Sequence, residues 1–214
     1  MKFYFLLFIF LVSLSAKSQL SFKAEVDEIQ KKHKHLIKNG KEHIVFTGSS
    51  SIRIWQNLNK IFNNSDIVNT GFGGSKASDL LYYIEELILD FNPTKVVIYE
   101  GDNDINSGQS IDFIYENILK IIQKINVKNS NVKIIIISAK PSITRWHLRE
   151  KYIILNKKYK DLATKSKNIQ FADTWSAMIE NGDLKKNIFI SDGLHLNAKG
   201  YEIWERVIKS VLNN

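Results

Sequence analysis

The chain has 214 residues, of which 44% are hydrophobic and none is cysteine. This length and apolar content suit one globular domain with a sizeable core. The lack of cysteine excludes disulfides, thiolate metal sites and cysteine nucleophiles. The formal net charge is +8, but the lysine pairs are scattered along the chain without interleaved aromatic residues. We therefore expect a solvated basic surface and no nucleic-acid partner.

The first residues have the pattern of a signal peptide. Lys2 precedes an apolar run over residues 3–12, which is shorter than the roughly 20 residues that a membrane-spanning helix needs. Small residues at Ala16 and Ser18 predict cleavage before Gln19. We therefore expect a signal peptide over residues 1–18, one folded domain over residues 19–214, and export to the periplasm or the medium with no membrane insertion after cleavage. An uncleaved N-terminal anchor is the alternative.

Amphipathic and short apolar segments alternate along the rest of the chain. An apolar stripe with helical spacing predicts a first helix over residues 21–38. Strands are predicted at residues 44–47, 66–69, 94–99, 132–138 and 168–172. Helices are predicted at residues 53–62 and 76–91, from a Ser110 cap to residue 125, from residue 145 onward, and around residues 203–211. This alternation predicts a three-layer α/β/α sandwich around a flavodoxin-like, five-stranded parallel sheet of order 2-1-3-4-5.

Chemically distinctive residues follow each predicted strand. Ser49, Ser50 and Ser51 follow the first strand, the glycine cluster of residues 71–74 follows the second, and Asn103 follows the third. The segment 140–146 follows the fourth strand, and Asp192 and His195 lie beyond the fifth. Since ligands in open α/β sheets bind beyond the carboxyl ends of the strands, we expect these segments to meet at one edge.

The residue types that meet there suit acyl transfer. A serine hydroxyl becomes a nucleophile when an imidazole takes its proton, and a carboxylate orients the imidazole. Backbone N–H groups and an asparagine amide can stabilise the oxyanion. The competing interpretations are a serine that only caps a helix and glycines that only permit a turn. A nucleotide-binding turn is excluded, because Lys76 occupies the third glycine position of G-x-G-x-x-G and no P-loop is present.

Four short blocks resemble the SGNH, or GDSL-like, hydrolase superfamily, in the order that this family has. They are Gly48-Ser49-Ser50, Gly74, Asn103 and Asp192-Gly193-Leu194-His195. The first block, continuing as Ser-Ile-Arg-x-Trp, is similar to the single-domain branch related to the catalytic subunits of platelet-activating-factor acetylhydrolase.

The resemblance implies a role for each block. It implies Ser50 as nucleophile, His195 as general base and Asp192 as triad acid, with an oxyanion hole formed by Ser50, Gly74 and Asn103. Ser49 replaces the usual aspartate of the first block, which is not the triad acid in this family.

We predict from this an exported serine esterase that hydrolyses small-molecule or glycan acyl esters, with short acyl groups, through an acyl-enzyme. The alternatives are a specific carbohydrate O-acetyl esterase or lysophospholipase, or a catalytically silent glycan-binding module on the same fold. Arg145 and Trp146 begin a predicted helix at the same sheet edge, where we expect them to face the substrate. Asp102, Asp104, Asp192 and His195 are an alternative hard-metal cluster, but the resemblance implies neither a metal nor another cofactor.

Overall fold

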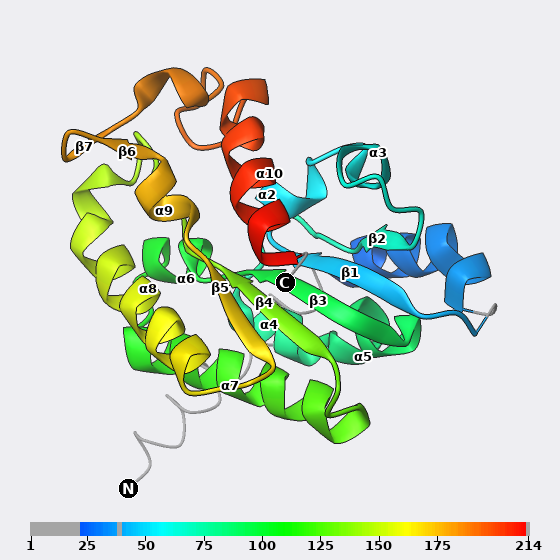
Figure 1. Ribbon diagram of the computed structural model, residues 1–214. Helices are drawn as coiled ribbons and strands as arrows, with labels where there is room; N and C mark the ends of the chain where they lie inside the picture. The colour runs from blue at the N-terminus through cyan, green and yellow to red at the C-terminus, as the bar shows by residue number, and fades with distance from the viewer. Residues whose placement is uncertain (1–21, 38–39, 213–214) are drawn as a thin grey trace, which may run out of the picture.

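A five-stranded parallel sheet forms the centre of the computed structural model, which describes residues 22–37 and 40–212. The strand order is β2-β1-β3-β4-β5, and each neighbouring pair is parallel (Figure 1). The strands are β1 (His43–Gly48), β2 (Ile67–Asn69), β3 (Pro93–Tyr99), β4 (Lys133–Ile137) and β5 (Ile169–Ala172). The predicted sheet order and the three-layer α/β architecture are confirmed.

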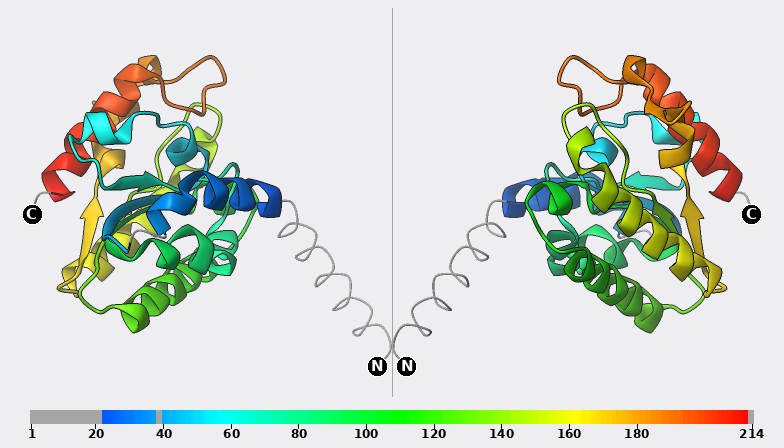
Figure 2. Two further views of the ribbon diagram at one scale, coloured as in Figure 1. Left: turned by 90° about the vertical axis from the view of Figure 1, so that its right-hand side faces the viewer. Right: turned by 90° about the vertical axis from the view of Figure 1, so that its left-hand side faces the viewer.

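Helices cover both faces of this sheet. Figure 2 shows α10 (red) on one side and α7 (green) on the other. The α-helices are a first helix over residues 22–37, α2 (Ser50–Arg53), α3 (Leu58–Ile61), α4 (Ala77–Tyr82), α5 (Ile84–Leu87), α6 (Asp102–Asn106), α7 (Ile111–Lys128), α8 (Arg149–Thr164), α9 (Thr174–Ala177) and α10 (Ala198–Leu212). Short 3-10 turns η1 (Leu89–Phe91), η2 (Trp146–Leu148) and η3 (Lys186–Ile188) and a hairpin of β6 (Ile179–Glu180) and β7 (Asp183–Leu184) complete the described elements.

The central strands are buried on both faces. Val96 and Ile98 of β3 belong to a core shared with α4, α7 and α8, whereas Val97 and Tyr99 belong to a core shared with α10. All four side chains are at most 1% exposed. Because successive side chains in a strand point to opposite faces, a strand covered on both sides must be apolar throughout. This explains the uninterrupted apolar runs in the sequence.

The predicted cap of α7 is present. Ser110 lies at its N-cap, and the Ser110 Oγ atom accepts a hydrogen bond from the Phe113 N–H at 3.2 Å. The buried side chains of α7 recur with helical spacing and pack against the sheet. They are Ile114, Asn117, Ile118, Ile121, Ile122 and Ile125.

Two helices that were predicted as continuous are interrupted in the structure. In place of one helix over residues 53–62, α2 ends at Arg53 and α3 begins at Leu58. Asn57, directly before α3, has a left-handed φ of 60°, a conformation that asparagine tolerates. Residues 76–91 form α4, α5 and η1. In that segment the consecutive residues Leu87, Ile88 and Leu89 are all buried. A straight helix turns by about 100° per residue and cannot direct three consecutive side chains into one core.

The predicted signal peptide lies outside the described residues. Within residues 22–37 and 40–212, none of the helices combines the length and apolar character that crossing a membrane requires.

Candidate active site

Gly48 brings the end of β1 against β3 and thereby places the serines at the sheet edge. Its φ is +121°, and a Cβ atom added there would lie 2.1 Å from the Tyr99 carbonyl oxygen. Only glycine fits such a close backbone approach. The next N–H, that of Ser49, donates to the same carbonyl at 3.1 Å. Ser50 then becomes the first residue of α2 and is half-buried.

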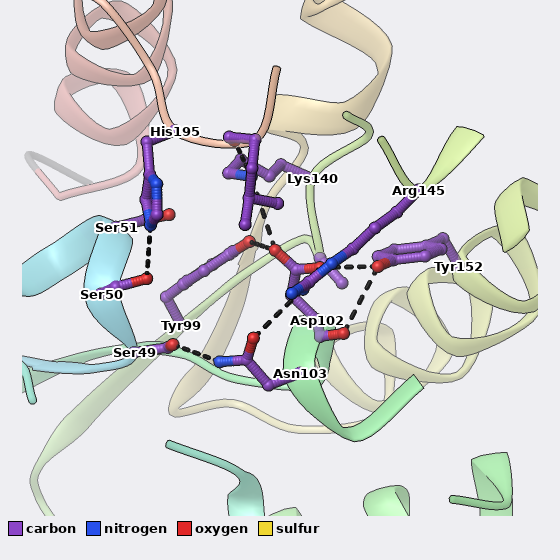
Figure 3. Close-up of polar contacts among 12 residues, drawn as sticks. Ser49, Ser50, Ser51, Tyr99, Asp102, Asn103, Lys140, Arg145, Tyr152 and His195 are labelled. Carbon is purple, nitrogen blue, oxygen red and sulfur yellow. Dashed lines mark hydrogen bonds and ion pairs between the residues drawn. The ribbon is translucent and has the colours of Figure 1, made fainter. Parts of the chain in front are cut away.

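Ser50, His195 and Asp192 form a continuous hydrogen-bonded chain. Ser50 Oγ lies 2.9 Å from His195 Nε2, and His195 Nδ1 lies 2.6 Å from Asp192 Oδ2 (Figure 3 shows the serine and the imidazole). Burial raises the pKa of Asp192, but hydrogen bonds from His195 and from backbone N–H groups outweigh it and lower this pKa to about 2. An ionised carboxylate only accepts, so Nδ1 carries the proton and Nε2 of a neutral ring accepts from the serine hydroxyl. This polarity is the one that general-base activation of a hydroxyl requires.

The loop that carries the histidine is organised around the same carboxylate. Asp192 Oδ1 accepts the N–H groups of Leu194 at 2.8 Å and His195 at 2.9 Å. The Gly193 carbonyl in turn accepts the N–H of Ile143, in the segment after β4, at 2.9 Å. The imidazole therefore belongs to a loop fixed both internally and by a neighbouring segment.

The segments that carry Gly74 and Asn103 both contact the serine turn. Gly74 has a positive φ of 74° and belongs to a turn joined to β1 by the Phe72 N–H, which donates to the Gly48 carbonyl at 2.9 Å. Within the described part of the chain, the backbone N–H groups of Ser50 and Gly74 donate no hydrogen bond. Asn103 Nδ2 donates to Ser49 Oγ at 2.6 Å, so its amide lies beside the residue that precedes Ser50.

Ser49 does not cap α2 through its side chain. It occupies the N-cap position, but its hydroxyl makes no capping hydrogen bond and instead accepts from the Asn103 amide. The helix-cap interpretation of the serine turn is therefore wrong for this residue. Ser49 is 2% exposed, which leaves its hydroxyl as a structural contact of the asparagine.

Asp102, next to Asn103, is a buried carboxylate that the sequence suggested only as a metal ligand, whereas the structure pairs it with two cations. Asp102 Oδ2 accepts from Tyr99 Oη at 3.0 Å and Lys140 Nζ at 3.4 Å, and Oδ1 accepts from Arg145 Nη1 and Tyr152 Oη, both at 2.6 Å (Figure 3). Burial raises the pKa of Asp102, but Lys140 and Arg145 outweigh it and lower this pKa to about 2. The sequence indicated only that the loops after β3 and β4 meet at one edge of the sheet. The spacing of residues did not indicate that Asp102 pairs with Lys140 and Arg145.

Arg145 and Trp146 both lie at this edge. The Arg145 side chain is 12% exposed and is engaged by Asp102 and Asn103. The Trp146 ring stacks on Trp175 at 6.2 Å between ring centroids. A substrate-facing role for the two residues stays a prediction, and the arginine has partners that the sequence did not indicate.

Fold and site together define a class: a three-layer α/β/α hydrolase with its polar loops gathered at the carboxyl edge of a parallel sheet. The GDSL-like lipase/acylhydrolase family model matches residues 45–203, and the chain belongs to this family. The protein is therefore an ester hydrolase, and the family resemblance of its four sequence blocks is confirmed.

Solved structures of this family have the same fold. A protein provisionally assigned as a platelet activating factor from Streptococcus pneumonia is 25% identical, with a TM-score of 0.77 over 95% of this chain and 99% of that one. A provisional acylhydrolase from Bacteroides fragilis is 27% identical, with a TM-score of 0.70 over 82% and 88%. A GDSL-like lipase from Bacteroides thetaiotaomicron is 24% identical, with a TM-score of 0.70 over 86% and 96%. Among functionally curated proteins, none matches this chain.

Proposed function

We propose that the protein hydrolyses carboxylic acyl esters through an acyl-enzyme on Ser50. The observation that carries this proposal is the pair of contacts made by His195, at 2.9 Å to Ser50 Oγ and 2.6 Å to Asp192 Oδ2. A base within hydrogen-bond reach of a hydroxyl, itself oriented by a carboxylate, is the arrangement that activates a serine.

The reaction proceeds in two balanced steps. Ser50 Oγ attacks the ester carbonyl carbon while its proton passes to His195 Nε2, and the ionised Asp192 stabilises the resulting imidazolium. The oxyanion is stabilised by the N–H groups of Ser50, Gly74 and Asn103. Its collapse breaks the bond to the alcohol, which takes the proton from Nε2. Water then attacks the acyl-enzyme with the same base and releases the carboxylic acid and Ser50. No cofactor takes part.

Short acyl groups are the proposed substrates, on small molecules or glycans. The segments 138–145 and 189–197 that surround the site are tied to each other through Ile143 and Gly193, which leaves little chain for a separate lid. Long acyl chains need an apolar tunnel or lid to cover them, because exposed methylene groups contribute no burial free energy. We further propose that the enzyme acts outside the cytoplasm, on the basis of the signal-peptide pattern of residues 1–18.

The first test is Ser50→Ala. The variant loses its nucleophile and should lose all measurable hydrolysis of short p-nitrophenyl esters and all labelling by a fluorophosphonate probe, while the wild type is active and labelled. Circular dichroism and the melting temperature verify that the variant is folded. Unchanged turnover in the variant would refute the assignment of Ser50, and an unlabelled, inactive wild type would favour a silent glycan-binding module.

A second experiment resolves the substrate class. The purified protein is offered acetylated xylan, an acetylated sialic acid and a lysophospholipid, and the released acid is quantified. We expect acetate release from the acetylated compounds to exceed fatty-acid release from the lysophospholipid. The opposite ranking would assign the protein to lysophospholipases and reject the proposal of short acyl groups.

A further inference from the structure

Arg145 bridges the buried carboxylate and the asparagine proposed as an oxyanion donor. Its Nη1 atom lies 2.6 Å from Asp102 Oδ1 and 3.1 Å from Asn103 Oδ1. The proposed reaction assigns no step to this arginine. Figure 3 shows its side chain reaching from the segment after β4 across to the start of α6, where the aspartate and asparagine are adjacent in sequence.

The contacts of Asn103 determine which way its amide faces. A guanidinium only donates, so the atom facing Arg145 must be the amide oxygen. At the other end, Nδ2 donates to the Ser75 carbonyl at 2.9 Å, and a carbonyl only accepts. Both ends therefore require the same orientation, in which one N–H donates to Ser49 Oγ at 2.6 Å and the other to the Ser75 carbonyl. An oxyanion must share or replace one of these two acceptors, because the amide has only two N–H groups.

The arginine also strengthens the amide as a donor. A cation that binds an amide oxygen draws electron density from the nitrogen, because linked hydrogen bonds polarise one another. The charge persists at every working pH, since arginine does not deprotonate in proteins. The effect grows in a site that excludes water, and only 12% of the Arg145 side chain is exposed.

Asp102 holds the arginine in this position and joins it to the histidine loop. The Asp102 side chain is 7% exposed and also binds Lys140, whose side chain is fully buried. Lys140 Nζ donates in addition to the carbonyl of Leu194, the residue before His195, at 2.7 Å. The Asp102 carboxylate thus binds Arg145, which contacts Asn103, and also Lys140, which contacts the loop that carries His195.

We propose that Arg145 is a positioning residue that orients and polarises the Asn103 amide for oxyanion stabilisation. This proposal rests on the proposed function. Removal of an oxyanion donor costs about 10²–10³ in kcat, and the loss of its positioning group should cost a part of this, about 10-fold to 100-fold. The effect should fall on kcat with KM nearly unchanged, because the interaction is strongest in the transition state.

The kinetic arm compares Arg145→Met, Arg145→Lys, Asn103→Ala and the double variant Asn103→Ala/Arg145→Met. Arg145→Met should lose about 10-fold to 100-fold in kcat, and Arg145→Lys should recover part of it because it retains the charge. The double variant should be no slower than Asn103→Ala, because the arginine acts through the asparagine. The exposed Arg206 of α10 provides a matched control, and Arg206→Met should keep wild-type kcat. Additive losses in the double variant, or a wild-type kcat in Arg145→Met, would overturn the proposal.

A spectroscopic experiment tests the contact between Arg145 and Asn103 without relying on activity. The side-chain amide signals of Asn103 are identified by their loss in Asn103→Ala and followed by nuclear magnetic resonance in the unliganded protein. In Arg145→Met they should shift, because the amide oxygen loses a charged partner, whereas Arg206→Met should leave them in place. Unchanged signals in Arg145→Met would overturn the proposal. An inactive wild type would contradict the proposed reaction on Ser50, whereas the signals of Asn103 would still test its contact with Arg145.

Discussion

Each of the three adjacent serines has a different environment. Ser50 Oγ bonds the imidazole, Ser49 Oγ bonds the Asn103 amide, and the Ser51 carbonyl accepts from Tyr201 Oη at 2.8 Å. Ser49 and Ser51 are each 2% exposed. A nucleophile needs both a base and access to the substrate, and within the described part of the chain only Ser50 of the three is hydrogen-bonded to His195.

Ser49→Ala and Ser51→Ala test this difference between neighbours. Both variants should retain fluorophosphonate labelling of Ser50, because neither removes the base or the nucleophile. Ser49→Ala should lower kcat by less than about tenfold, since Asn103 keeps its contacts with Ser75 and Arg145. Mass spectrometry of the labelled peptide locates the modified residue. A label on Ser49 or Ser51 in the wild type would contradict the assignment.

At the scale of elements, the helix over residues 22–37 holds the glycine turn in place. Phe22 packs edge-on against Phe72 with ring centroids 5.3 Å apart, and Val26 is 1% exposed in the core. Both carboxylate oxygens of Glu25 accept the Gly73 N–H at 3.1 Å, and Arg53 Nη1 pairs with the same carboxylate at 3.2 Å. The turn that carries Gly74 is therefore held by a helix far away in sequence.

Glu25→Ala should loosen this turn. It removes the acceptor of the Gly73 N–H and should lower the unfolding free energy by about 1 kcal/mol, which corresponds to a melting temperature lower by about 2–4 °C. We expect kcat to fall as well, because Gly74 follows directly. Glu25→Gln keeps an acceptor oxygen and should be milder. The exposed Glu28, on the same helix, supplies the control Glu28→Ala. Equal melting temperatures for Glu25→Ala and Glu28→Ala would show that the contact is not stabilising.

For the whole molecule, the buried carboxyl groups of Asp102 and Asp104 contribute to the variation of stability with pH. Asp104 is 0% exposed and accepts the Ala77 N–H at 3.1 and 3.3 Å. Burial raises its pKa to about 7, although this N–H opposes the shift, whereas the pKa of Asp102 is lowered to about 2. Between pH values of about 4 and 7, the native state therefore binds one more proton at Asp104 than the unfolded state does. Between about pH 2 and 4, it binds one proton fewer at Asp102 than the unfolded state does.

The contributions of these two groups to stability have their maximum near pH 4. Stability falls as the pH drops from about 4 to 2, because the folded pKa of Asp102 is depressed, and it falls as the pH rises from about 4 to 7, because that of Asp104 is raised. Asp104→Asn cannot ionise and should reduce the second decline, measured by urea unfolding across this range. Asp112, whose side chain is 78% exposed, gives the control Asp112→Asn. An identical decline in wild type and Asp104→Asn would contradict the role of Asp104.

The sequence by itself determined the sheet order and the edge where the polar segments meet. Apolar runs such as residues 96–99 alternate with amphipathic segments, and short-range periodicity records which faces will be buried. The positions of Ser50, Asn103 and His195 after separate strands follow from this alternation, since parallel strands end at the same edge.

Only the tertiary structure decided which side chains pair within that edge. The Glu25 contact with Gly73, the Ser49 contact with Asn103 and the cations around Asp102 join residues that are distant in sequence. No local pattern specifies such pairs, because burial, charge balance and hydrogen-bond satisfaction are settled when several loops pack together. The same reason applies to the break between α2 and α3: helical spacing describes one face, whereas the end of a helix depends on what packs around it.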